Sequence, residues 1–418
     1  MRVLVIGSGL LGVSSAWFLA REGCEVTVLD RLGGAAQGTS FANAGMLTPS
    51  MADPWNSPGI FWHLLRWLGR EDAPFLVRPR ALPAMLGWGL AFVASSTAAR
   101  QRASMDANLR LASYSLEMLR ELRGSLKLAY DGLSHGTLKV FRDRRAFDAA
   151  AARNATLRGL GLELRTVTPA EAVALEPALA PVRDALAGAV YCPGDESGDA
   201  RAFTLALADH ARAQGVRFQF DREVTGFEQA GGSITAALAG GSRYEAEQFV
   251  VAAGSWSAPL LERLGVALPV RPVKGYSITL PTAHWSGAPR MPVIDDALHA
   301  AATPLGARLR VAGTAELAGY DTELTPARID NLFDLLLRLF PTYPQPLDRA
   351  GAQPWAGLRP MSPDGVPRIG RLACDNLFVN TGHGHLGWTL ATGSGALLSD
   401  LILGKAPQLS PAPYRPDR

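Results

Sequence analysis

The chain has 418 residues, more than one small domain needs, which predicts two domains. Hydrophobic residues make up 48% and charged residues 19%, a balance that suits a large buried core and excludes extensive disorder. The net charge of +3 gives no reason to expect nucleic acid as a partner. The three cysteines form no CxxC pair and the isolated histidines lack ligand spacing, so we expect neither a disulfide framework nor a metal site.

The first thirty residues carry the strongest local signal. Residues 2–6 are an apolar, β-branched run typical of a buried parallel strand, and Gly7, Gly9 and Gly12 follow in G-x-G-x-x-G spacing. In this spacing the first glycine permits a tight turn, the second lets a pyrophosphate approach the backbone, and the third lets the next helix pack closely. That helix begins at Leu10 and Leu11, where free N–H groups and the helix dipole favour an anion.

A second strand, residues 25–29, ends at Asp30, and an acid at this position accepts hydrogen bonds from ribose hydroxyls. The same acid disfavours a 2′-phosphate, and with it NADP. Arg31 follows directly and is expected at the same site. Strand, glycines, helix, strand and acid occur in order, so we predict a dinucleotide-binding βαβ unit. This fingerprint alone does not choose between FAD and NAD.

The loop at residues 38–46 is rich in small and hydroxyl-bearing side chains. Such residues suit a backbone wrapped around a flat ring and its phosphates, and an ordinary polar loop is the alternative. The candidate cofactor contacts in this loop are Ser40, Asn43, Ala44, Gly45 and Met46.

A second glycine-rich region lies near the other end of the chain. A Gly-Leu-Arg-Pro segment precedes a strand at residues 377–380, a glycine-rich turn and a helix of small residues at 389–403. Glycines beside a helix start form another site for an anion or a ring edge. Sites at both ends of the chain imply a long cofactor, which favours FAD over NAD. The candidate contacts here are Gly357, Arg359, Gly382, Gly384, Leu386, Gly387, Trp388 and Thr389.

Together these segments resemble the D-amino-acid dehydrogenase small-subunit family, within the wider D-amino-acid oxidase and glycine oxidase superfamily. The matching segments are residues 5–9, 40–45, 274–277, 357–365 and 381–389, and they span nearly the whole chain in order. The resemblance implies noncovalent FAD and oxidation of an amine to an imine that hydrolyses to a 2-oxo acid. It also implies electron transfer to a quinone or respiratory chain, and contact of Gly254 with the nucleotide.

Four residues are candidates for the reaction itself. A guanidinium holds a carboxylate through two parallel hydrogen bonds, and the resembling oxidases place an arginine over the flavin where Arg359 stands. A structural pair with Asp364 is the alternative for this arginine. Tyr276 is either a substrate contact or a half-buried sheet tyrosine, and Lys274 either stabilises reduced flavin or lies at the surface. His383 either polarises the ring edge or fills the glycine turn.

Two positions depart from the family pattern. Pro304 stands where many members have an arginine near the pocket, and His385 stands where a small residue is common. Because of these two changes, two classes of substrate remain as alternatives: an ordinary D-amino acid, and a cyclic D-imino acid such as D-proline or hydroxyproline. A glycine or sarcosine oxidase is a near alternative, and a non-catalytic FAD-binding subunit of a complex is an alternative from another class.

The expected fold class is α/β: a Rossmann-type FAD-binding domain with an inserted α+β substrate domain built on an antiparallel sheet. We assign residues 1–50, 186–262 and 354–406 to the FAD-binding domain and residues 51–185 and 263–353 to the substrate domain. Strands are expected within residues 135–142, 216–220, 249–253, 267–281 and 290–313, and helices within 101–123, 200–215 and 326–340.

Residues 54–98 have an unusual composition. Tryptophans and arginines alternate in their first half, and no charge occurs between Arg80 and Arg100. This pattern fits either an interfacial anchor beside membrane quinone or a lid over the substrate domain. No signal peptide precedes the first strand, so we expect a cytoplasmic protein, or one peripheral to the cytoplasmic face of the inner membrane. The residues that define the pattern are Trp55, Trp62, Trp67, Trp88, Arg66, Arg70, Arg78 and Arg80.

Overall fold

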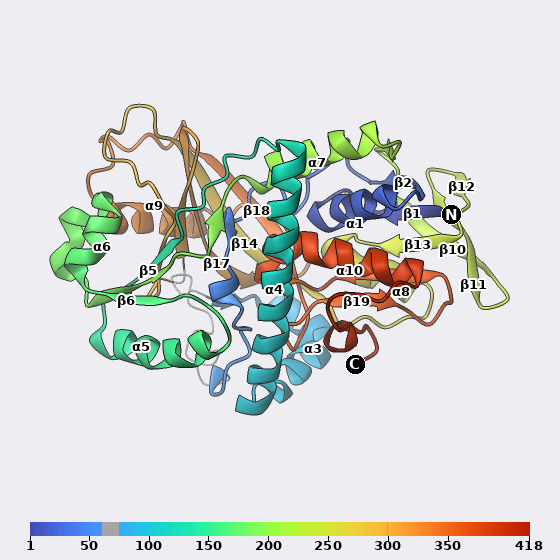
Figure 1. The fold of residues 1–418 in the computed structure, drawn as a ribbon, viewed down its shortest axis with the longest axis horizontal. Coiled ribbons are helices and arrows are strands. Elements are labelled where there is room, and N and C mark those ends of the chain that lie inside the picture. The colour runs from blue at the N-terminus through green and yellow to red at the C-terminus, as the bar shows by residue number, and fades with distance from the viewer. Residues whose placement is uncertain (61–74, 299) are drawn as a thin grey trace.

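A mostly parallel sheet organises the nucleotide-binding half of the molecule (Figure 1). The structure, a computed structural model, describes residues 1–60, 75–298 and 300–418. In the sheet order β19-β20-β13-β1-β2-β9, the strand β1 lies between β13 and β2 and pairs with both in parallel. The strands are β1 (Arg2–Ile6), β2 (Glu25–Leu29), β9 (Arg217–Gln219), β13 (Gln248–Val251), β20 (Leu377–Thr381) and the antiparallel edge strand β19 (Arg368–Arg371).

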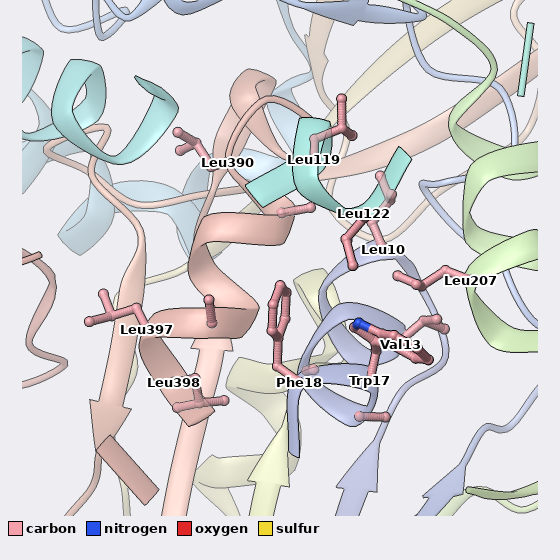
Figure 2. Packing of buried hydrophobic residues seen from close by; sticks show 14 of the residues in the cluster. Leu10, Val13, Trp17, Phe18, Leu119, Leu122, Leu207, Leu390, Leu397 and Leu398 are labelled. Carbon is pink, nitrogen blue, oxygen red and sulfur yellow. The ribbon is translucent and has the colours of Figure 1, made fainter. Parts of the chain in front are cut away.

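Four helices build the core beside this sheet, and they come from distant parts of the sequence (Figure 2). They are α1 (Leu10–Arg21), α4 (Ala98–Leu126), α7 (Ala200–Ala213) and α10 (Ala391–Leu403). Two glycines of α10 set how closely the helices approach. A Cβ atom on Gly395 would lie 2.8 Å from the backbone carbon of Ser14 in α1, and one on Gly393 would lie 2.9 Å from the Cα of Ser115 in α4. The C-terminal helix is therefore packed backbone to backbone against the N-terminal one.

The other half is built on a larger, mainly antiparallel sheet. Its strand order is β18-β14-β17-β16-β15-β5-β7-β6, with β4 paired to β17. Helix α9 (Pro326–Leu339) packs an apolar face against this sheet. The strands are β4 (Phe75–Val77), β5 (Thr137–Phe141), β6 (Arg165–Val167), β7 (Gly188–Cys192), β14 (Arg271–Pro281), β15 (Val293–Asp295), β16 (Ala300–Leu305), β17 (Arg308–Leu317) and β18 (Gln353–Met361). Both the α/β fold class and the antiparallel substrate sheet are thus confirmed.

Smaller elements complete the fold. The short strands β3 (Met46–Leu47) and β8 (Glu196–Ser197) pair with each other, and β10 (Val224–Ala230), β11 (Ser233–Ala239) and β12 (Ser242–Tyr244) form an antiparallel sheet. The remaining helices are α3 (Leu82–Ala94), α5 (Arg144–Gly159), α6 (Pro169–Leu175) and α8 (Ser257–Glu262). The 3-10 turns are η1 (Pro49–Met51), η2 (Pro79–Ala81), η3 (Pro177–Ala185), η4 (Gly254–Trp256), η5 (Gly384–Leu386) and η6 (Ala412–Tyr414).

The sheets assign three segments differently from the sequence-based domain boundaries. Strands β7 and β18 fall in ranges that we expected in the FAD-binding domain, but both pair within the larger sheet. Helix α4 falls in the expected substrate range, yet Leu111, Leu119 and Leu122 pack into the nucleotide-binding core. Periodicity predicts α4 but not the strands β7 and β18, and a local pattern carries no information on which distant strand or helix each element contacts.

The segment at residues 54–98 forms β4, η2 and α3 in its described part. Trp62, Arg66, Trp67 and Arg70 lie outside the described residues. One face of α3 packs Met85, Trp88 and Phe92 against the larger sheet and Met361. In the described chain no single helix is long and apolar enough to cross a membrane, although the bent pair Pro79–Ala94 and Ala98–Leu126 meets the length and composition criteria together.

Replacing Gly395 with alanine tests the close contact between α1 and α10. The added methyl would overlap the backbone of Ser14, so we expect unfolding to become easier by about 1–3 kcal/mol. The melting temperature should fall by roughly 1–4 °C, measured by differential scanning calorimetry. Gly124→Ala is the matched control, because the space around that exposed helical glycine is open and alanine favours a helix by up to about 1 kcal/mol. Equal melting temperatures for Gly395→Ala and the unmodified protein would contradict the packing.

Candidate functional site

A large cavity of about 1140 Å³ extends from the glycine-rich loop after β1 to strands β14, β17 and β18 of the larger sheet. Its volume exceeds the ~300–1,000 Å³ of ordinary small-molecule pockets, which suits a dinucleotide cofactor together with a small substrate. Both ends of the chain line it, as the sequence predicts. The predicted site residues on its wall are Gly7, Gly9, Leu10, Leu11, Asp30, Arg31, Ser40, Asn43, Ala44, Gly45, Met46, Gly254, Tyr276, Gly357, Arg359, His383, Gly384, Gly387 and Trp388.

The turn after β1 has the geometry that binds phosphate. Gly7 has φ +108, and a Cβ atom there would lie 2.5 Å from the carbonyl oxygen of Ala252. A Cβ atom on Gly12 would lie 1.8 Å from the carbonyl oxygen of Gly7, so this glycine serves packing and does not line the cavity. A side chain at either position would collide with these backbone atoms. The N-terminus of α1 is therefore held open toward the cavity, where its N–H groups favour an anion.

Asp30 stands at the end of β2, as predicted. Its Oδ2 accepts hydrogen bonds from the N–H and the hydroxyl of Ser8, both 2.6 Å long, and its Oδ1 accepts one from the N–H of Leu32. The carboxylate therefore holds the phosphate loop in place and also faces the cavity. Beside it, the guanidinium of Arg31 lies 4.0 Å from the ring of Trp256. Sequence reasoning missed Trp256, although its place two residues after Gly254 was an available signal.

The loop at residues 40–46 is fixed to the larger sheet by side chains that the sequence analysis did not single out. Arg310 donates from Nη1 to the carbonyl of Asn43 at 3.2 Å, and Thr303 donates its hydroxyl to the carbonyl of Ala44 at 2.7 Å. Pro304 follows Thr303 in β16 and does not line the cavity. The loop is thus held rigidly between the two halves, where a cofactor ring would need a fixed wall.

Arg359 provides a positive charge on the cavity wall. Its Nη1 donates to the carbonyl oxygens of Thr314 at 3.1 Å and Lys274 at 3.4 Å. The guanidinium lies across Gly275, where a Cβ atom would be only 2.2 Å from Nη1. Burial lowers the pKa of Arg359 to about 10, which still leaves the group charged at neutral pH. Among the described residues no carboxylate lies within salt-bridge distance of it, so the cation is available to an anionic ligand.

The alternative pair between Arg359 and Asp364 is wrong. Asp364 instead accepts from Arg368 and Arg418, each at 3.2 Å. Short sequence separation suggested the pair, but β18 ends between the two residues and turns their side chains to different neighbours.

Thr314 marks a local strain that the sequence does not reveal. This β-branched residue has φ +58, where side chains other than glycine rarely sit, and it lies where the pairing of β14 and β17 shifts register. In this backbone conformation the carbonyl of Thr314 points toward Arg359 and accepts its hydrogen bond. A strained residue persists only where the surrounding structure holds it, and such residues are common at functional sites. Thr314 also lines the cavity.

Two of the predicted reaction residues have other partners. The hydroxyl of Tyr276 donates to Glu316 at 2.5 Å and lies 3.0 Å from the hydroxyl of Thr325, so the structure does not support its contact with substrate. Tyr276 therefore only lines the cavity. Burial raises the pKa of its hydroxyl. Lys274 is fully buried, with Nζ 3.6 Å from Asp321, so the surface alternative is wrong. Since Lys274 does not line the cavity, a role beside the flavin is not supported either.

Both histidines of the glycine turn are held neutral, His383 in a buried position and His385 in a half-buried one. His383 shares a 2.8 Å hydrogen bond between Nε2 and the hydroxyl of Ser394, and burial lowers its pKa to about 3. His385 stacks on Trp55 with ring centroids 5.3 Å apart, and its Nε2 lies 3.4 Å from the carbonyl of Met51. Burial, opposed by that carbonyl and assisted by the charge of Arg359, lowers the pKa of His385 to about 4. Neither ring adds charge to the cavity at neutral pH.

Three further predicted contacts lie behind the cavity wall. Gly382 packs beside the backbone of Arg368, Leu386 belongs to the hydrophobic core, and Thr389 accepts the N–H of Thr48 at 3.1 Å. They hold the glycine turn against the N-terminal half without lining the cavity. No group of three or more metal-ligating side chains was found within the described residues.

Comparison with known proteins places this geometry in a family. The family model described as FAD dependent oxidoreductase matches residues 2–401. The D-amino acid dehydrogenase of Paramagnetospirillum magneticum is 44% identical and covers 98% of this chain and 97% of its own length. That of Dechloromonas aromatica is 45% identical and covers 98% of both.

Solved structures share the fold. Glycine oxidase from Geobacillus kaustophilus aligns with a TM-score of 0.77 at 24% identity, covering 100% of this chain and 99% of its own. L-proline dehydrogenase from P. horikoshii aligns with a TM-score of 0.76 at 20% identity, covering 99% and 96%. At these identities the likeness concerns the fold alone.

Replacing Asp30 with alanine tests the cofactor end of the cavity. The change removes the acceptor for a ribose hydroxyl and for Ser8, and charge-assisted hydrogen bonds of about 1.5–3 kcal/mol correspond to roughly 10- to 100-fold weaker FAD binding. Titration of the FAD-free protein with FAD measures this. Glu25→Ala, at the opposite end of β2 and paired with Arg217 at the surface, should bind FAD like the unmodified protein. Unchanged affinity in Asp30→Ala would contradict the assignment.

Proposed function

The chain belongs to the family of FAD-dependent oxidoreductases, and from that premise we propose that it oxidises D-amino acids at the carbon that carries the nitrogen. The observation that carries the proposal is Arg359, a cation on the wall of the cofactor cavity that has no acidic partner among the described residues. An amino acid presents a carboxylate, the anion that a planar guanidinium binds best. The names of the full-length relatives support the D-amino acid as substrate.

The protein's own part in this reaction is to bind and orient. Bound FAD supplies the acceptor for the hydride that leaves Cα. Arg359 holds the substrate carboxylate through paired hydrogen bonds, and the carbonyl of Thr314 fixes the guanidinium from behind. Trp55, 5.7 Å from that guanidinium, closes one side with an apolar ring. The imine product then hydrolyses to the 2-oxo acid.

Anaerobic bleaching of the flavin by a panel of D- and L-amino acids, D-proline, glycine and sarcosine tests the proposal. We expect D-enantiomers to bleach the flavin and L-enantiomers to leave it oxidised. Bleaching by glycine and sarcosine alone would favour the oxidase alternative, and no bleaching by any substrate would identify a non-catalytic subunit.

Within the same assay, Arg359→Ala should lower the efficiency of flavin reduction by about 10²- to 10⁴-fold, since two charge-assisted hydrogen bonds of about 1.5–3 kcal/mol each are lost. FAD should remain bound. Arg349→Ala, which removes an exposed arginine paired with Asp330, is the matched control and should behave like the unmodified enzyme. Normal turnover by Arg359→Ala would contradict the carboxylate clamp.

We further propose that electrons pass to a quinone at a membrane surface that α3 contacts. The outward face of α3 exposes Leu82, Leu86, Leu90 and Val93, with Leu90 74% exposed. Arginines flank the helix at both ends, and Arg80 and Arg100 are exposed. Exposed leucines between arginines fit an interface of acyl chains and anionic headgroups. A lid over the cavity is the competing role for this segment.

The double substitution Leu86→Asp with Leu90→Asp separates the two roles. Loss of two leucines from the lipid interface, at about 1.5–3 kcal/mol each, should weaken binding to vesicles of anionic lipid by at least 100-fold in a sedimentation assay. Leu205→Asp in α7 is the matched control, an exposed leucine on another surface, and should bind vesicles normally. Unchanged vesicle binding with altered substrate KM would establish the lid instead.

A further inference from the structure

A buried aspartate beside the cavity has no cationic partner. Asp195 lies in the turn between β7 and β8 and is 2% exposed. Its Oδ2 accepts the hydroxyls of Ser50 at 2.5 Å and Thr137 at 2.6 Å, and its Oδ1 accepts the N–H of Ser50 at 3.2 Å. No lysine, arginine or histidine in the described chain is within salt-bridge distance of it. A lone buried carboxylate is costly, which points to a use for it.

Ser50 connects this carboxylate to the cavity. The pairing of β3 with β8, with Leu47 opposite Glu196, brings the turn η1 beside Asp195. Ser50 and Thr137 both line the cavity, whereas Asp195 lies behind them. The hydroxyl of Ser50 therefore has its proton on the carboxylate side and a lone pair available toward the cavity.

This serine lies close to the substrate end of the cavity. The next residue, Met51, has its carbonyl 3.4 Å from Nε2 of His385. The His385 ring stacks on Trp55, over which the guanidinium of Arg359 also lies. The contacts from Arg359 through Trp55 and His385 to Met51 place η1 at the same end of the cavity as Arg359.

We propose that Ser50 and Asp195 together take the proton that the substrate ammonium group must lose before a hydride can leave Cα. This inference rests on the proposed function. The ammonium N–H bond breaks as its proton moves to the oxygen of Ser50, and the proton of that hydroxyl moves to Oδ2 of Asp195. The nitrogen keeps the electron pair and can then assist hydride departure. Ser50 touches the substrate, and Asp195 acts through it.

Three other polar side chains of the cavity wall, His383, His385 and Tyr276, are poorer proton acceptors. His383 and His385 have pKa values lowered by burial to about 3 and about 4. The Tyr276 hydroxyl is bound to Glu316. By contrast, burial raises the pKa of Asp195 to about 6, opposed by the hydrogen bonds from Ser50 and Thr137, which leaves it ionised at neutral pH yet basic enough to accept a proton.

The groups around Asp195 leave its proton chemistry undisturbed. Burial, with a smaller contribution from Asp195, raises the pKa of the Cys192 thiol to about 12, so the thiol keeps its proton. Charged side chains on β5 and β8 are paired with other charged groups. These are Lys139 with Asp296, and Glu196 with Arg120 and Arg123.

The pH dependence of anaerobic flavin reduction by a D-amino acid tests the proposal in the FAD-loaded enzyme. In the unmodified enzyme, efficiency should fall below about pH 6 and stay nearly level above it, because Asp195 must be ionised. In Asp195→Asn and in Ser50→Ala the efficiency of flavin reduction should be about 10²- to 10⁴-fold lower at pH 7, the usual contribution of a general base. It should then rise tenfold per pH unit as free amine forms in solution.

Controls separate this role from a structural one. Ser50→Ala keeps the carboxylate and its bond from Thr137, so the test stands even where Asp195→Asn fails to fold. Ser50→Thr restores a hydroxyl and should restore the level profile. Asp148→Asn changes an exposed aspartate of α5 that is paired with Arg144 and should keep the unmodified profile.

Each outcome decides the matter. A level profile in Ser50→Ala, or a profile in Asp148→Asn that matches the one expected of Ser50→Ala, would overturn the assignment. Absence of reduction in the unmodified enzyme by any D-amino acid would instead overturn the proposed function.

Discussion

The close contact of the last long helix with the first one is the constraint on which the site depends. Gly393 and Gly395 let α10 approach the backbones of α4 and α1, and the parallel pairing of β20, β13 and β1 aligns the loops that follow these strands. The carboxyl ends of parallel strands share one edge of a sheet, which is where such folds bind ligands. Two glycine-rich segments far apart in the sequence therefore border one cavity.

A second constraint acts on the larger sheet, which must hold the side chain of Arg359 in place while its positive charge stays unpaired among the described residues. Strand β14 offers Gly275 beneath the Arg359 guanidinium, and β17 offers the strained carbonyl of Thr314. Carbonyl oxygens fix the orientation of a cation but leave its charge intact. Both histidines of the glycine turn are kept neutral by burial, so neither adds a second charge beside Arg359. This geometry suits the substrate carboxylate that we propose as the ligand of Arg359.

The sequence predicts features that depend on local spacing. The G-x-G-x-x-G turn, Asp30 at the end of β2 and the main helices and strands follow from patterns within a few residues, and the family resemblance located Arg359. Features that depend on distant partners were missed. The hydroxyl of Tyr276 has Glu316 as its partner, 40 positions away, and β18 joins the larger sheet through β14. Nothing local to Thr314, or to the pair of Ser50 and Asp195, signals their roles.

The central claim is that both ends of the chain enclose one FAD molecule. Titration of the folded, FAD-free protein with FAD, followed by flavin absorbance and by the quenching of tryptophan fluorescence, tests it most directly. The account predicts saturation at one FAD per chain, with a yellow protein that keeps its cofactor through gel filtration. A correctly folded protein that stays colourless in excess FAD would contradict it.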